Sequence, residues 1–311
     1  MQSSPTDIAR AAALLRAGKL VAFPTETVYG LGANALDPAA VDRLFTAKGR
    51  PDTSPLIVHV ASIEMALALA LTWSAQAEAL ARKFWPGPLT LVVRKRPEIL
   101  DRVTAGLDTV GLRMPSHPVA LDLIRAAGLP VAAPSANRFG ELSPTTADHV
   151  RSGLGDAVAM ILDGGPATVG IESTVLSLAG PEAVLLRPGM ISQADIESVI
   201  GPVVVAGAPA TGSHSSPGLH PRHYSPHTPM VLVDQGQLPE SGRGALLWIH
   251  HLAIAAKTLR MPDHPDTYAA SLYATLHALD GEGWDWIAVE RPPDEPRWAA
   301  VLDRLMRAAS R

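Results

Sequence analysis

Two groups of polar residues, far apart in the sequence, have the types and spacing to bind a polyanion. Lys48 and Arg50 stand one residue apart at the end of a predicted helix, and Ser135 and Asn137 follow a short apolar run. An ammonium and a guanidinium can share a phosphate chain, since the first acts as a point charge and the second as a bidentate donor. The hydroxyl and the amide can orient the same ligand. On spacing alone, however, two solvated cations at a helix C-terminus are the more ordinary interpretation.

The segments around these groups are predicted to alternate between strands and helices. An apolar run at residues 20–23 predicts a strand that leads into a polar, glycine-containing loop at residues 24–32, and Asp37 with Pro38 predicts the start of a helix that ends at Lys48. Further strands are predicted at residues 55–60, 89–93, 110–113, 130–133 and 159–163, further helices at 8–17, 64–71, 74–84, 119–126, 145–151 and 195–200, and a hairpin at 173–187. This order predicts an α/β fold with a twisted, mixed sheet flanked by helices.

Residues 206–228 separate two predicted domains. Gly, Pro, Ser, Thr and His dominate this segment and its apolar periodicity ends, so we interpret it as a linker between a larger domain at residues 1–205 and a smaller, Rossmann-like α/β domain at residues 229–311. The second half of the linker is too rich in aromatic and cationic residues for a passive spacer, and we expect it to cover a site. The smaller domain contains no glycine-rich phosphate loop, which favours a binding or bracing role.

The composition excludes several classes of site. The chain contains no cysteine, so disulfides, thiolate metal sites and cysteine nucleophiles are ruled out. A net charge of −4 argues against nucleic-acid binding over the whole surface, although a local basic cleft remains compatible with it. No apolar run reaches the ~20 residues that a membrane span needs. We therefore expect a soluble, cytoplasmic protein.

Five segments, in order along the chain, carry a resemblance to a known family. They are PTETVYGLG at residues 24–32, KGRP with PLIVH at 48–59, APSAN with SPT at 133–145, EST at 172–174 and LRPG at 186–189. Together they resemble the YrdC family. The linker and the smaller domain are similar to the longer, two-domain branch of this family, the threonylcarbamoyl-AMP synthases.

The resemblance implies a nucleotidyltransferase reaction. L-threonine, bicarbonate and ATP would give threonylcarbamoyl-AMP and pyrophosphate, which is the first step of threonylcarbamoyladenosine formation in tRNA. ATP is then a substrate, Mg²⁺ is expected with it, and a downstream threonylcarbamoyl transferase complex acting on tRNA is the expected partner. Direct nucleic-acid binding is compatible with this role but not required. The sequence contains no G-x-x-x-x-G-K-[ST], so the site is not a P-loop.

The resemblance also implies two halves of one pocket. The half for ATP comprises Lys48, Arg50, Ser54, Thr109, Ser135, Asn137, Ser143, Arg187 and Tyr224. The half for threonine comprises Thr27, His59, Arg113, Ala133 and Ser173. We expect Lys48, Arg50, Ser135 and Asn137 to act as catalytic residues, by positioning and electrostatics, because the carbamate oxygen can itself attack phosphorus. The general base and any metal ligands stay open.

The chain departs from the family pattern at two places. Ser54 stands where the family usually has Asn, which puts an amide contact to the nucleotide in doubt. His220-Pro221 stands where the family often has Lys-Tyr, which puts a cation of the linker in doubt.

Two alternatives remain on the sequence alone. One is an RNA-binding module, whose phosphate contacts should spread over a wide basic face rather than converge with hydroxyls. The other is a carbamoyl-adenylate chemistry that starts from carbamoyl phosphate, as in hydrogenase maturation proteins, and this would show no dependence on threonine.

Overall fold

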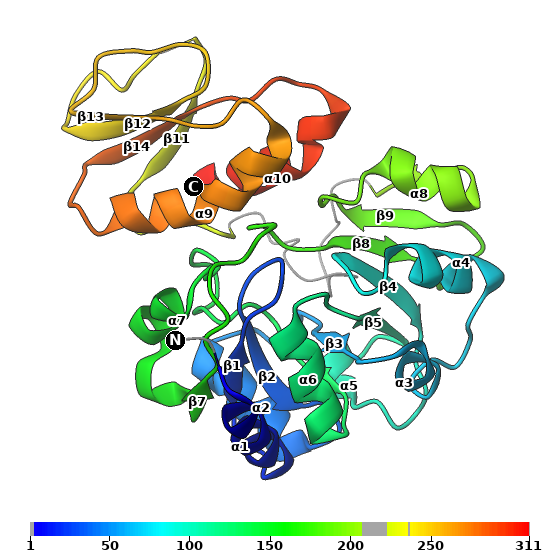
Figure 1. Cartoon of the computed structure of the whole chain (residues 1–311). Helices are drawn as coiled ribbons and strands as arrows, with labels where there is room; N and C mark the ends of the chain where they lie inside the picture. The colour runs from blue at the N-terminus through cyan, green and yellow to red at the C-terminus, as the bar shows by residue number, and fades with distance from the viewer. Residues whose placement is uncertain (1–2, 207–222, 236, 311) are drawn as a thin grey trace.

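Two sheets organise the structure, a computed structural model that describes residues 3–206, 223–235 and 237–310. Ten strands form a mixed sheet in the larger, N-terminal part, and four strands form a parallel sheet in the smaller, C-terminal part (Figure 1). The predicted α/β fold, with a mixed sheet and a second, smaller α/β domain, is confirmed.

The larger sheet combines parallel and antiparallel neighbours. In spatial order its strands are β10 (Val204–Val205), β9 (Val184–Arg187), β8 (Thr174–Ser177), β4 (Leu89–Arg94), β5 (Thr109–Arg113), β3 (Ile57–His59), β6 (Val131–Ala132), β2 (Gly30–Asn34), β1 (Val21–Phe23) and β7 (Met160–Ile161). β3 and β5 run parallel, whereas β4 with β5 and β8 with β9 are antiparallel. As a result, the C-terminal ends of β3, β5 and β9 and the N-terminal end of β8 lie on the same side of the sheet, at one end of the strands.

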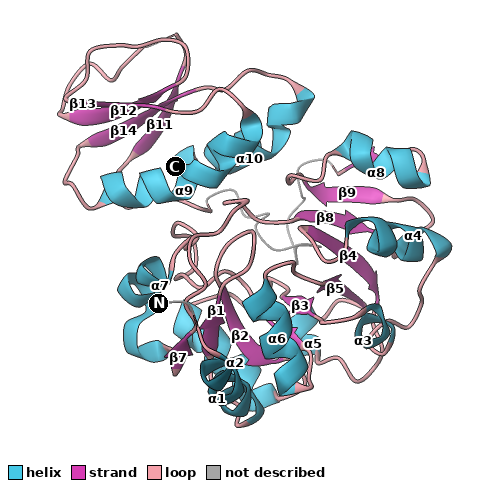
Figure 2. Ribbon diagram, in the orientation of Figure 1, coloured by secondary structure: helices cyan, strands magenta, loops and turns pink. Residues whose placement is uncertain are grey.

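Helices cover the faces of this sheet (Figure 2). They are α1 (Pro5–Arg16), α2 (Pro38–Lys48), α3 (Ile63–Leu67), α4 (Ala75–Phe84), α5 (Asp101–Thr104), α6 (Pro118–Ala127), α7 (Ala147–Leu154) with the 3₁₀ turn η1 (Gly155–Ala157), and α8 (Gln193–Ile200). The ends of α2 follow its sequence signals. The Asp37 carboxylate accepts the Ala39 N–H at 2.9 Å, and Gly49, at φ 61°, takes the left-handed conformation that ends the helix.

The structure differs from the sequence interpretation at the glycines of residues 24–32. The predicted loop extends only to residue 29, because β2 begins at Gly30 and pairs with β1. Gly32 serves close packing rather than a turn, since a Cβ there would lie 2.9 Å from a ring carbon of Phe23. The predicted helix at residues 64–71 is also shorter, ending at Leu67, and α5 was not predicted.

The smaller domain is a parallel sheet with two helices on the side that faces the larger domain (Figure 1). Its strands are β11 (Met230–Val233), β14 (Trp286–Glu290), β12 (Gly244–Trp248) and β13 (Lys257–Arg260), and its helices are α9 (Pro265–Asp280), η2 (Pro296–Trp298) and α10 (Ala299–Ala309). Its buried apolar cluster includes Val28, Leu142 and Ile171 of the larger domain. The two domains therefore share a core.

The described end of the predicted linker is packed between the domains. His223, Tyr224 and Ser225 are buried, and Ser225 donates its N–H to Gly140 O at 2.9 Å and its hydroxyl to Ala308 O at 3.1 Å. These residues thus touch both domains. Residues 207–222, including His220 and Pro221, lie outside the described residues. None of the described helices has both the length and the apolar character to cross a membrane.

Two histidines stack across the domain interface. His149 on α7 and His277 on α9 have ring centroids 3.9 Å apart, and His277 Nε2 lies 3.1 Å from Ser143 O. Burial, and then the neighbouring charge of His277, lowers the pKa of His149 from 6.5 to about 4, and burial lowers the pKa of His277. Both rings are therefore neutral in the folded protein at neutral pH.

These lowered pKa values predict a loss of stability in acid. Below pH 6.5 the unfolded chain binds a proton at His149 while the folded chain does not, so the free energy of unfolding should fall as the pH drops from 6.5 to about 4. The lowered pKa of His277 acts in the same direction. The slope should be below about 1.4 kcal/mol per pH unit for each ring. Urea unfolding at pH 7.5, 6, 5 and 4.5 measures it. His149→Phe, which keeps a stacked ring, should flatten the slope, whereas the exposed-site control His264→Phe should not.

Candidate active site

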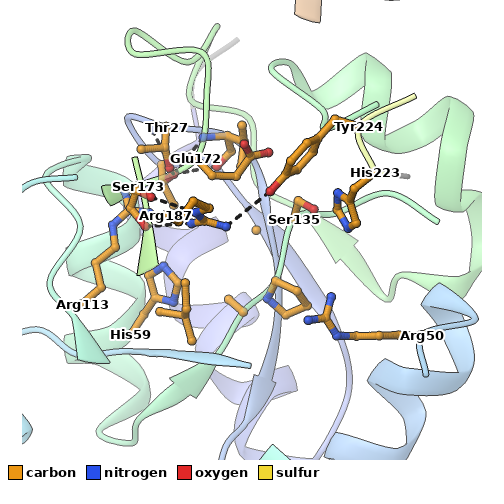
Figure 3. Close-up of a pocket in the computed structure, with 16 residues that line it drawn as sticks. Thr27, Arg50, His59, Arg113, Ser135, Glu172, Ser173, Arg187, His223 and Tyr224 are labelled. Carbon is orange, nitrogen blue, oxygen red and sulfur yellow. Dashed lines mark hydrogen bonds between the residues drawn. The ribbon is translucent and has the colours of Figure 1, made fainter. Parts of the chain in front are cut away.

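A pocket lies where the ends of β3, β5, β8 and β9 meet, next to Tyr224. It encloses about 540 Å³ when the open mouth and the solvent space in it are included. Figure 3 shows Tyr224 and His223 on one side and His59 and Arg113 on the other, with Arg187 between them. Residues from both halves of the predicted site therefore face one space.

The pocket brings together most of the residues predicted from the sequence. All those predicted for threonine line it, namely Thr27, His59, Arg113, Ala133 and Ser173. Of those predicted for ATP, Arg50, Ser135, Arg187 and Tyr224 line it. Thr109 lines a neighbouring hollow, and the remaining four, Lys48, Ser54, Asn137 and Ser143, are not among the lining residues.

Three buried guanidinium groups give the pocket its charge. Arg187 donates from Nε to Ser173 O at 3.1 Å and from Nη2 to Ser173 Oγ at 3.2 Å. Arg113 Nη2 lies 2.7 Å from Glu26 Oε1, and Arg50 Nη2 donates to Pro55 O at 2.9 Å. Burial, and to a smaller extent the charge of Arg187, lowers the pKa of Arg50 to about 10, so it stays protonated at neutral pH. The part of the pocket wall formed by these three guanidinium groups is thus suited to an anion.

Lys48 supports this wall from behind. Its Nζ donates to Ser135 O at 2.6 Å and to Asn137 O at 2.5 Å, and the side chain is buried. Burial, together with the charge of Arg50, lowers the pKa of Lys48 well below its ordinary value. Through these two hydrogen bonds the Lys48 side chain is engaged with the backbone of residues 135–137, and it holds Ser135 at the pocket.

The other residues behind the wall have similar contacts. The Ser54 hydroxyl accepts from Arg50 Nη2 at 3.0 Å, and Ser143 Oγ donates to Glu172 Oε1 at 2.5 Å. Asn137 donates from Nδ2 to Arg138 O and Glu141 O, while its buried Oδ1 has no hydrogen-bond partner among the described residues. The hydroxyls and the amide thus fix the loops that carry the lining residues.

His59 is a neutral hydrogen-bonding group rather than a cation. Burial, followed by the charge of Arg113, lowers its pKa to about 3. Its ring packs edge-on against Phe23, and its buried Nδ1 has no hydrogen-bond partner within the described parts of the chain. A neutral imidazole beside Arg113 can read a hydroxyl or an amine without repelling the guanidinium.

An apolar hollow of about 290 Å³ continues the pocket along the same face of the sheet. Ile57 lines both spaces. Thr109, Gly111 and Arg113 stand at every second position of β5, so all three share one face of the strand. Gly111 keeps the hollow open, since a Cβ there would lie 3.2 Å from a Thr90 methyl. The cationic pocket therefore has an apolar neighbour on the same face of β5.

Two family models match successive parts of the chain. The Sua5_yciO_yrdC model, described as "Telomere recombination", matches residues 13–189. The model described as "Threonylcarbamoyl-AMP synthase, C-terminal domain" matches residues 191–310. The chain belongs to the Sua5/YciO/YrdC family.

Relatives match the chain over nearly its whole length. A protein of Bacillus subtilis named threonylcarbamoyl-AMP synthase is 43% identical over 327 residues, covering 99% of this chain and 94% of that protein. The crystal structure of Pyrococcus abyssi Sua5 complexed with L-threonine superposes with a TM-score of 0.93 at 40% identity, covering 99% of this chain and 96% of that chain. The similarity to these two proteins therefore extends over both domains of this chain.

A likeness to HypF is limited to the fold. Full-length HypF, in a phosphate- and nucleotide-bound form, aligns with a TM-score of 0.52 at 24% identity, over 58% of this chain and 28% of that chain. This chain is thus similar to Sua5 in sequence and in the fold of both domains. Its similarity to HypF concerns the fold of one domain.

Four polar or charged residues that line the pocket, or that contact a lining residue, were not predicted from the sequence. They are Thr25, Glu26, Glu172 and His223. Glu26 and Glu172 lie within two of the five family segments, and this membership was the signal that could have found them. Nothing in the spacing indicated that His223 would stand edge-on to Phe139, with ring centroids 5.4 Å apart.

The donor set does not suit a metal ion held by protein carboxylates. No group of three or more His, Cys, Asp or Glu side chains able to hold a metal is found in the described residues. The Glu172 carboxylate, which lines the pocket, already accepts from Ser143, Tyr273 and Arg304. Mg²⁺ commonly keeps water ligands and binds through substrate phosphates, so these residues fit a metal only as part of a nucleotide complex.

Proposed function

We propose that the protein synthesises L-threonylcarbamoyl-AMP from L-threonine, bicarbonate and ATP and releases pyrophosphate, as the first step of threonylcarbamoyladenosine formation in tRNA. The observation that carries the proposal is the convergence of three guanidiniums with hydroxyls in one pocket that continues into an apolar hollow. Near-full-length similarity to relatives named threonylcarbamoyl-AMP synthase supports it. Residues 1–205 would be the catalytic domain, 206–228 the linker and lid, and 229–311 the bracing domain.

Threonine would occupy the end of the pocket near β3 and β5. Arg113 is suited to the amino-acid carboxylate, since a guanidinium donates two parallel hydrogen bonds to it. The hydroxyls of Thr27 and Ser173 and the neutral ring of His59 are suited to the amine and the side-chain hydroxyl. The backbone of Ala133 would form a further contact with threonine. Discrimination against serine rests on one methyl group, worth about 1–3 kcal/mol, so selectivity for threonine should be modest.

ATP would extend from the cations into the hollow. Arg50, Arg187, Ser135 and Tyr224 are suited to the phosphates, and Thr109 stands in the hollow where the nucleoside would fit. Ser54, Ser143, Asn137 and Lys48 would act through the loops they hold. Mg²⁺, bound to the triphosphate, would neutralise charge on the departing pyrophosphate.

The chemistry needs positioning rather than a covalent nucleophile. The threonine amine bonds to the carbon of bicarbonate and water leaves, which gives the carbamate. The carbamate oxygen then attacks the α-phosphorus, the bond to pyrophosphate breaks, and Arg50 and Arg187 stabilise the charge that moves onto the leaving group. Tyr224 covers the pocket and would exclude water from the unstable carbamate. The product would pass to a threonylcarbamoyl transferase complex that acts on tRNA in the cytoplasm.

Pyrophosphate release that depends on threonine tests this function. Purified protein with ATP, Mg²⁺ and bicarbonate should release pyrophosphate when threonine is added, and omission of threonine should lower the rate to background. Coupled detection of pyrophosphate, with mass spectrometry of the adenylate, measures both products. Release that continues at the same rate without threonine would reject the assigned substrate and favour a chemistry based on carbamoyl phosphate.

A further inference from the structure

One guanidinium of the C-terminal domain binds two of the segments that form the pocket, without lining the pocket itself. Arg304 on α10 is fully buried. Its Nε donates to Glu172 Oε2 at 2.7 Å, its Nη2 to Glu172 O at 3.1 Å, and its Nη1 to Pro188 O at 3.0 Å. Glu172 precedes Ser173 and Pro188 follows Arg187, so Arg304 holds the backbone next to both of these lining residues.

The same guanidinium contacts a third segment. Its central carbon lies 5.4 Å from the ring centroid of Tyr224, and the Tyr224 hydroxyl lies 3.4 Å from Arg187 Nη1. Tyr224 has φ 61°, a left-handed conformation that costs energy for a side chain other than glycine. The contact with Arg304 helps to keep Tyr224 in this conformation above the pocket.

Glu172 is the shared partner in this cluster. Its Oε1 accepts from Ser143 Oγ at 2.5 Å, and its Oε2 accepts from the Tyr273 hydroxyl of α9 at 3.2 Å as well as from Arg304. Glu172 also lines the pocket, as Arg187 does (Figure 3). Arg304 is the cation paired with this carboxylate, and its Nη1 also lies 2.7 Å from Asp303 Oδ2, so one guanidinium bridges Glu172 and its own helix.

We propose that Arg304, assisted by Tyr273, is a positioning residue for the reaction: it neutralises Glu172 and fixes the segments that carry Ser173, Arg187 and Tyr224. The inference rests on the proposed function and deepens it, because it makes the C-terminal domain a part of the catalytic unit. Loss of Arg304 leaves a buried carboxylate without its counter-ion beside the nucleotide site. That carboxylate then turns to Arg187 or repels the phosphates.

Steady-state kinetics of a set of variants tests the proposal. Arg304→Met should raise KM for ATP and lower kcat/KM for ATP by about ten- to a hundredfold, because a small misplacement of the binding groups is enough for this effect. Arg304→Lys should recover part of the loss, and Tyr273→Phe should show a smaller loss. The double variant Arg304→Met/Glu172→Gln should recover activity over Arg304→Met, since it removes the uncompensated charge. Arg297→Met, at an exposed residue just before α10, is the control.

The outcomes separate a positioning role from a structural one. A purely structural role lowers the amount of folded enzyme, so it lowers apparent kcat but leaves KM for ATP unchanged and gives no recovery in the double variant; that result overturns the proposal. If Arg304→Met does not fold, Arg304→Lys and Tyr273→Phe with unchanged KM overturn it equally. If the wild type releases no pyrophosphate with threonine, the proposed function fails instead, and calorimetric ATP binding by the same variants still decides the role of Arg304.

Discussion

Replacement of Arg187 by methionine is expected to lower kcat/KM for ATP by about a hundredfold or more, the loss typical of removing one preorganised donor to a developing anion. Arg187 stands at the C-terminal end of β9, is buried, and is oriented by two hydrogen bonds to Ser173. A cation fixed in this way needs no reorganisation when charge moves onto pyrophosphate. Methionine has a similar length and keeps the packing. Pyrophosphate release at varied ATP and saturating threonine measures the loss.

Two controls make this result specific. Arg125→Met removes an exposed guanidinium of the same domain, which pairs with Asp122 at 3.2 Å, and should leave the kinetics unchanged. Arg187→Lys keeps the charge but cannot form both bonds to Ser173, so it should retain only part of the activity. Wild-type kcat/KM in a folded Arg187→Met protein would mean that the phosphates lie elsewhere, nearer to Arg50.

Local sequence signals were sufficient for much of the fold, whereas the residues of the pocket were predicted from the resemblance to a family. The capped start of α2 at Asp37 and Pro38, and the apolar runs of β1 and β4, matched the elements that formed. β13 was missed because Lys257–Arg260 is a short edge strand with alternating exposure and little apolar content. The glycines of β2 were misread because glycine in a turn and glycine under a ring look alike in a sequence.

The directions of side chains were beyond the reach of spacing. Lys48 and Arg50 form one motif, yet only Arg50 lines the pocket, because Gly49 ends α2 between them and Lys48 turns to two backbone carbonyls. Glu172 was noticed in its motif without a role, since its partner Arg304 lies 132 residues further along the chain. Contacts at such separations follow from the docking of two domains.

Replacement of Arg113 by alanine is expected to raise KM for threonine by about ten- to a hundredfold or more, because a hydrogen bond to a charged group contributes about 1.5–3 kcal/mol and Arg113 can donate two. The change should act on ATP much less, since Arg113 stands at the His59 end of the pocket, on β5 next to β3. Pyrophosphate release at varied threonine and saturating ATP, and then the reverse, gives both KM values.

Part of this loss should come from the residue that Arg113 neutralises. Glu26 is buried and lies 2.7 Å from Arg113 Nη2, so the variant leaves a carboxylate without its cation where a second carboxylate, that of threonine, must bind. Arg113→Ala/Glu26→Gln should therefore bind threonine better than Arg113→Ala alone, while Glu26→Gln by itself should have a smaller effect. A larger rise in KM for ATP than for threonine would reverse the assignment of the two ends. It would place the amino acid beside Arg187 and the nucleotide beside His59.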